Sequence, residues 1–127
     1  MEVIKIIKTD DTPSITLDAQ NDLFEISGRS LPEDVAAFYE PILDWLERYS
    51  KDPNDKTVFN FKLVYFNTAS SKLLLDILLI LEEIYEAGND VLVRWHFPDD
   101  DEDMEEAGEE YADIVEIPFE QVSYSMD

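Results

Sequence analysis

The chain has 127 residues, 45% of them hydrophobic, and its 31 acidic and 9 basic residues give a formal net charge of −22. This length and composition suit one domain spanning residues 1–127 with a core of its own. The negative charge argues against nucleic acids and anionic membranes as partners, and the lack of cysteine excludes disulfides, thiolate metal sites and cysteine nucleophiles.

The N-terminal part of the chain predicts three strands and then a helix. The strands are expected at residues 3–7, 15–17 and 23–26, and the last two form a hairpin closed around Asn21 and Asp22. Ser30 and Glu33 have the spacing of a capping box, and apolar residues recur after them at helical spacing. Pro41 is expected to kink this helix, because proline lacks a backbone N–H group.

The rest of the chain alternates between strands and helices. The expected elements are a strand at 57–66, a leucine-rich helix at 71–87 ended by Gly88, a buried strand at 91–97, an acidic loop and helix at 99–111, and an extended segment at 114–122. Pro118 restricts the last segment to a sheet edge or a bend. This order predicts a small α/β domain, with a mixed sheet of about five to six strands, two main helices and a short acidic C-terminal helix.

Charge is distributed unevenly along the chain. Residues 97–127 hold 13 acidic residues and no Lys or Arg, whereas residues 1–96 hold 18 acidic and 9 basic residues. The C-terminal quarter is therefore predicted to be a solvated or partner-facing surface. The N-terminus lacks a signal-peptide pattern, and no apolar run reaches the roughly 18 residues of a membrane span, so we expect a cytoplasmic protein without membrane insertion.

The junction between the strand at 57–66 and the next helix is the most informative segment. Thr68 lies beside a helix N-terminus, where backbone N–H groups lack intrahelical partners and attract anions. Its hydroxyl can cap the helix, or it can carry a phosphate against the positive end of the helix dipole. Local sequence alone favours the capping role. Ser70 and Ser71 are equally suitable caps, so spacing does not identify a modified hydroxyl.

A helical wheel of residues 73–87 separates a core-facing arc from an acidic arc. The core-facing residues are Leu73, Leu74, Ile77, Leu78, Ile80, Leu81, Ile84 and Tyr85. Leu75 and Leu79 fall among the acidic residues, and they form one stripe with Thr68 and Lys72 if the helix reaches back that far. Two interpretations stay open: the C-terminal segment buries both leucines, or the leucines form a partner interface.

Two other patterns are less persuasive. Five acidic residues match the spacing of a calcium loop, namely Asp99, Asp101, Asp103, Glu105 and Glu110. Met104 occupies the position that requires glycine, so a solvated acidic face is the better interpretation. His96, the only histidine, lies in an apolar strand without a nucleophile pattern nearby, which favours packing over catalysis. We therefore expect no enzymatic activity, no metal and no cofactor.

The segment from Phe66 to Ser70, with the leucine-rich helix and strand that follow, resembles the phosphorylated turn of bacterial anti-sigma-factor antagonists, the STAS domains. Thr68 falls where that family carries its phosphorylated serine, although Asn67 replaces Asp and no Gly follows Ser70. The chain resembles the SiaC family of regulatory phosphoproteins more closely and over nearly its whole length. The landmarks are segments 26–28, 32–34, 38–39, 44–46, 65–72, 95–104 and 117–119.

This resemblance implies a non-enzymatic partner switch with a STAS-like fold. A cognate kinase would phosphorylate Thr68, a metal-dependent Ser/Thr phosphatase would reverse the reaction, and the unphosphorylated form would bind and activate a diguanylate cyclase in cyclic-di-GMP and biofilm signalling. The expected partner-binding residues are Asn67, Thr68, Ser70, Ser71, Lys72, Leu75 and Leu79. The alternatives are an acidic decoy that occupies a basic protein surface and a small-ligand or calcium-binding module.

Overall fold

The structure is a computed structural model that describes residues 1–125. In this range six strands and three helices form the mixed α/β fold that the sequence predicted. The elements are β1 (Ile4–Ile6), β2 (Ser14–Asp18), β3 (Leu23–Ser30), α1 (Val35–Tyr49), β4 (Lys56–Phe66), α2 (Thr68–Glu86), β5 (Asp90–Pro98), α3 (Glu102–Ile114) and β6 (Phe119–Tyr124). None of these helices combines the length and hydrophobicity needed to cross a bilayer.

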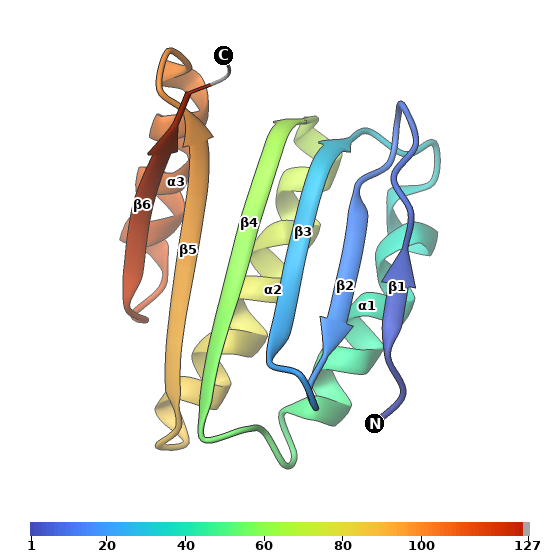
Figure 1. Ribbon diagram of the computed structural model, residues 1–127, viewed down its shortest axis with the longest axis vertical. Coiled ribbons are helices and arrows are strands. Elements are labelled where there is room, and N and C mark those ends of the chain that lie inside the picture. The colour runs from blue at the N-terminus through green and yellow to red at the C-terminus, as the bar shows by residue number, and fades with distance from the viewer. Residues whose placement is uncertain (126–127) are drawn as a thin grey trace.

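All six strands join one sheet whose spatial order follows the chain, from β1 to β6. The first three strands pair antiparallel, and the pairs from β3 to β6 are parallel. In Figure 1 the three helices lie behind the sheet, which leaves its front face without a helical cover. This arrangement places the core on one side of the sheet only.

The β2–β3 hairpin follows the expected turn chemistry. Asp22 has a φ of 55°, a left-handed conformation that Asp tolerates better than most residues. The carboxylate of Asp18 accepts hydrogen bonds from the backbone and side-chain nitrogens of Asn21, at 3.2 and 2.8 Å. Leu17 and Phe24 are then paired across the strands and both are buried. The turn and the hydrophobic alternation therefore specify the same register.

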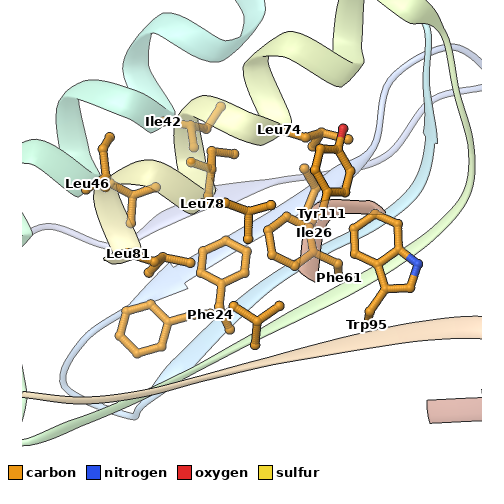
Figure 2. Close-up of a cluster of buried hydrophobic side chains, with 14 of the residues drawn as sticks. Phe24, Ile26, Ile42, Leu46, Phe61, Leu74, Leu78, Leu81, Trp95 and Tyr111 are labelled. Carbon is orange, nitrogen blue, oxygen red and sulfur yellow. The ribbon is translucent and has the colours of Figure 1, made fainter. Parts of the chain in front are cut away.

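The core fills the space between the covered face of the sheet and the helices. Along β4 buried and partly exposed residues alternate, so that Phe59, Phe61 and Leu63 face the helices. Trp45 of α1 stacks on Tyr49 with ring centroids 5.3 Å apart. Figure 2 shows part of this cluster, with the labelled residues Phe24, Ile26, Ile42, Leu46, Phe61, Leu74, Leu78, Leu81, Trp95 and Tyr111.

α1 begins later than the predicted capping box at Ser30 and Glu33. Its N-cap is Asp34, whose carboxylate accepts a hydrogen bond from the backbone N–H of Ala37 at 3.1 Å. Ser30 instead ends β3, where its buried hydroxyl meets the hydroxyl of Tyr39 at 2.6 Å. A tertiary hydrogen bond thus replaces the local cap that the sequence suggested.

The last two helices also differ in detail from the prediction. α2 begins three residues earlier than expected and ends as predicted before Gly88, whose φ is 106°. Tyr85, predicted to be a core residue, is 39% exposed because it lies on the solvent side of the last turn of α2, whereas Ile84 in the same turn is buried. Ile114, predicted to be extended, is the last residue of α3. β6 begins directly after Pro118, at the sheet edge.

Candidate functional site

The junction between β4 and α2 is capped by Asn67. This residue has extended backbone angles, and its side-chain oxygen accepts a hydrogen bond from the backbone N–H of Ser70 at 2.8 Å. Its own N–H donates to the carbonyl of Ser30 at 3.1 Å, which ties the start of α2 to the end of β3. Asparagine is a favoured N-cap residue. The capping role predicted for Thr68, Ser70 or Ser71 is therefore wrong, and Thr68 is the first helical residue.

The three hydroxyls that follow the cap have different environments. Ser70 is fully buried, and its Oγ donates to the carbonyl of Ser30 and accepts from the Ser30 hydroxyl, both at 2.9 Å. Ser30 also contacts the Tyr39 hydroxyl, and burial raises the pKa of Tyr39 to about 12. Ser71 donates to the carbonyl of Thr68 at 2.6 Å. Ser70 therefore does not fit the predicted partner surface.

The Thr68 side chain is exposed, and within residues 1–125 its hydroxyl has no hydrogen-bond partner. The first turn of α2 contains no acidic residue, although the chain has 31 of them. Lys72 is exposed one turn further along the same helix. A negative group on Thr68 would thus meet the positive end of the helix dipole and a lysine at the i+4 position, without an acidic neighbour in that turn.

Leu75 and Leu79 continue the face of α2 that begins at Thr68. Since α2 starts at Thr68, the spacings of 4, 7 and 11 residues place Lys72 and both leucines on the same side of the helix. Leu75 is partly buried against the core, whereas Leu79 is 39% exposed. Burial of both leucines by the C-terminal segment is therefore wrong for Leu79: α3 covers Leu75 in part, and Leu79 stays accessible. The partner interface stays a prediction.

A groove of about 280 Å³ lies between α2 and α3, next to this face. It is lined by Phe66, Ser71, Lys72, Leu75, Ala107, Glu110, Tyr111 and Ile114. The Tyr111 hydroxyl donates to the carbonyl of Ser71 at 2.8 Å, and burial raises the pKa of this tyrosine. Ile114 is 56% exposed at the rim. The groove therefore adds apolar surface from α3 to the predicted stripe on α2.

The other candidate residues occupy structural positions. Asp101 is the N-cap of α3 and accepts a hydrogen bond from the N–H of Met104 at 3.0 Å. The acidic residues after it are spread along α3 rather than wrapped around one point. His96 is partly buried, and its Nε2 lies 3.0 Å from the side-chain oxygen of Asn60. Asp101 is thus a helix cap, and His96 is a partly buried imidazole, as the sequence analysis favoured.

Sequence reasoning did not find Ser30, Tyr39, Tyr111 or Ile114 as neighbours of the switch segment. Ser30 of β3 and Tyr39 of α1 stabilise the start of α2 through buried hydrogen bonds: the Ser30 hydroxyl contacts the hydroxyls of both Tyr39 and Ser70. The last two belong to α3. An isolated tyrosine on the apolar side of an acidic helix is a weak signal, because it is equally typical of ordinary packing.

Comparisons with known proteins agree on one family. A family model described as "SiaC family regulatory phosphoprotein" matches residues 6–124. An uncharacterized protein of Pseudomonas aeruginosa strain UCBPP-PA14 is 34% identical over 119 residues, which is 94% of each chain.

Solved structures show the same relationship. The structure of SiaC of Pseudomonas aeruginosa has a TM-score of 0.89 and 31% identity, with 98% of this chain and 100% of that chain covered. A crystal structure of the diguanylate cyclase SiaD in complex with its activator SiaC, from the same species, contains a chain with a TM-score of 0.90 and 32% identity, with 95% and 99% coverage.

Proposed function

The chain belongs to the SiaC family of regulatory phosphoproteins, and from this premise we propose that it is a one-domain, cytoplasmic phospho-switch whose modified residue is Thr68. Membership of this family makes it a regulatory protein rather than an enzyme. The observation that carries the proposal is the Thr68 hydroxyl, which is exposed at the first residue of a helix and has no hydrogen-bond partner among residues 1–125. A cognate kinase would add the phosphate and a metal-dependent Ser/Thr phosphatase would remove it.

The output of the switch is activation of a diguanylate cyclase. Support comes from the complex in which Pseudomonas aeruginosa SiaC is described as the activator of SiaD. We assign the binding-competent state to the unphosphorylated chain, which links phosphorylation to cyclic-di-GMP signalling and biofilm formation. The output is then protein binding.

The proposed binding surface follows the face of α2 that begins at Thr68. It includes Asn67, Thr68, Ser71, Lys72, Leu75 and Leu79, and the groove toward α3 extends it to Ile114. A partner that covers these residues would remove Thr68 from water. Desolvating a phosphate dianion against an apolar partner costs several kcal/mol, enough to weaken binding by roughly a hundredfold or more. Phosphorylation would therefore block the surface without unfolding the domain.

The experiment combines phosphopeptide mapping with a binding assay. After reaction with the cognate kinase, phosphate should appear on Thr68, and Thr68→Ala should stay unmodified while it keeps cyclase binding and activation. Ser71→Ala is the matched control for the phosphopeptide mapping only, since Ser71 is a neighbouring hydroxyl that already has a hydrogen bond, and this variant should still be phosphorylated on Thr68. Phosphate on another residue would refute the assignment of Thr68.

A salt titration of the same binding assay tests the nature of the interface. An interface that rests on Leu75 and Leu79 should keep much of its affinity as salt is added, because apolar contacts are not screened. Collapse of binding at high salt would instead support the acidic-decoy alternative, in which the acidic C-terminal segment occupies a basic protein surface.

A further inference from the structure

The face of the sheet that the helices leave uncovered carries a cavity of about 580 Å³. This face is opposite to the helices, so the cavity is separate from the surface proposed around Thr68 (Figure 1). Its lining residues come from the β1–β2 loop and from β3, β4, β5 and β6. A site built from five segments has a shape that depends on the fold rather than on one flexible loop.

The cavity lies where β4 and β5 separate. The two strands pair from Lys56 and Asp90 up to Phe61 and Trp95, and beyond this point they are no longer paired with each other. Lys62 and Val64 line the cavity from β4, and His96 lines it from β5. The separation of the strands therefore explains why a hollow exists at this end of the open face.

The lining is basic in an otherwise acidic protein. Three of the nine basic residues line the cavity, namely Lys8, Arg29 and Lys62, whereas Asp10 is the one lining residue among the 31 acidic residues. Lys62 pairs with Glu25 at 2.8 Å. Within residues 1–125, Lys8 and Arg29 have no carboxylate within ion-pair distance. At physiological salt the Debye length is about 8 Å, so the influence of the more distant carboxylates on this local excess is weakened.

The backbone segments that carry Lys8 and Arg29 have a defined local structure. In the loop that carries Lys8, the N–H of Thr9 donates a hydrogen bond to the carbonyl of Thr12 at 2.9 Å. The backbone carbonyl of Asp11 in the same loop accepts a hydrogen bond from the N–H of Leu31 at 2.8 Å. Gly28 has a φ of 109°, and the β3–β4 register shifts between Gly28 and Arg29. Such bulges redirect side chains, often next to functional sites. Arg29 lies 5.4 Å from the centre of the Tyr65 ring.

The remaining walls are suited to a ring rather than to a second charge. Val64 and Tyr124 supply apolar and aromatic surface. Burial, together with the neighbouring charges of Lys62 and Arg94, lowers the pKa of His96, so this side chain acts as a neutral hydrogen-bonding group. A few polar groups that converge on an apolar wall are typical of small-molecule sites, whose volumes are roughly 300–1,000 Å³.

We propose that this cavity binds a nucleotide-sized, phosphate-bearing small molecule, with its phosphate between Lys8, Arg29 and Lys62 and its ring against Val64 and Tyr124. Inorganic phosphate alone would leave most of the volume empty. This proposal does not depend on the function assigned to Thr68, because no residue is shared between the two surfaces.

The test is calorimetric titration of the full chain with the four ribonucleoside monophosphates, the matching nucleosides and inorganic phosphate at low salt. At least one nucleotide should bind roughly tenfold or more tightly than its nucleoside and than phosphate alone. Arg29→Gln and Lys62→Gln should each lower the affinity for that nucleotide by about tenfold, since each removes a charge-assisted contact. Circular dichroism confirms that both variants, which change partly or fully exposed side chains, are folded.

Lys56→Gln is the matched control, because it removes the same charge from the same strand outside the cavity. Its nucleotide affinity should equal that of the wild type. The proposal is overturned if no nucleotide binds up to millimolar concentration, or if nucleosides or phosphate bind as tightly as nucleotides. It is equally overturned if Lys56→Gln weakens binding as much as Arg29→Gln does, since the attraction would then be diffuse.

Discussion

Phosphorylation of Thr68 should raise the free energy of unfolding rather than lower it. Thr68 is exposed at the first position of α2, so a phosphate on its hydroxyl would stay hydrated and would not displace a packed side chain. The first turn of α2 has no acidic residue to repel it. Near pH 7 the group carries a charge of about −2, because its second pKa is about 6.

The expected gain combines two favourable interactions. A charge beside the positive end of a helix contributes about 0.3–1 kcal/mol at an exposed site. An i, i+4 pair with Lys72 adds about 0.2–0.5 kcal/mol. Repulsion from the remaining net charge of −22 opposes this gain, but salt screens it beyond about 8 Å. We therefore expect a net stabilisation of about 0.5–1.5 kcal/mol, or a rise in Tm of roughly 2–6 °C for a domain of this size.

Thermal unfolding of fully phosphorylated and unmodified protein measures this gain. Thr68→Ala, treated with the same kinase, controls for phosphate elsewhere on the chain. The difference in Tm should shrink as salt is added, because the interactions are electrostatic. A fall in Tm, or a loss of helical circular dichroism on phosphorylation, would refute the reasoning and show that the phosphate acts by disrupting the start of α2.

Four further substitutions test the packing, the proposed surface and the pH dependence. Gly108→Ala should cost about 1–3 kcal/mol in urea unfolding, because the new methyl carbon would lie 2.5 Å from the buried ring of Trp95; unchanged stability would contradict this packing. Leu79→Ser should weaken cyclase binding about three- to tenfold, because the 39% exposed leucine would lose its proposed contact with the partner. Leu75→Ser should in addition lower Tm, because Leu75 packs against the core. Equal Tm values for the two variants would contradict the view that only Leu75 contributes to the core. Burial lowers the pKa of His96 below 6.5 in the folded state. The unfolded state therefore takes up the proton first, and the free energy of unfolding should fall as the pH drops through about 6.5. His96→Gln should reduce the slope of the free energy of unfolding against pH, and an unchanged slope would contradict the lowered pKa.

Local patterns predicted most of the fold because its elements are locally consistent. The turn at Asn21 and Asp22, the alternation along β4 and the leucine periodicity of α2 each specify one structure, and the sheet satisfies all of them. The predictions are wrong where a residue distant in sequence determines the hydrogen bonding of a side chain. The hydroxyl of Ser30 fits a capping box in sequence, yet in the fold it is buried against Tyr39. No local pattern contains that contact.

The open-face cavity was beyond sequence reasoning for a similar reason. Lys8, Arg29 and Lys62 are separated by more than 20 residues each, and they look like scattered surface charges in an acidic chain. Only the order of the strands brings the three together on one face. Motif reasoning detects functional residues that are adjacent in sequence, whereas the three cations of this cavity come from three separate segments.

The switch segment shows how the fold discriminates among neighbouring hydroxyls that the sequence leaves equivalent. Because Asn67 caps α2, the helix begins at Thr68, and helical geometry then turns Ser70 toward the core and Thr68 toward solvent. A kinase that modified Ser70 would have to open the buried cluster with Ser30 and Tyr39, which would leave buried polar groups unpaired at about 1–3 kcal/mol each. Modification of Thr68 would break no hydrogen bond within the described part of the chain. The proposed selectivity for Thr68 over Ser70 would therefore follow from where the helix starts.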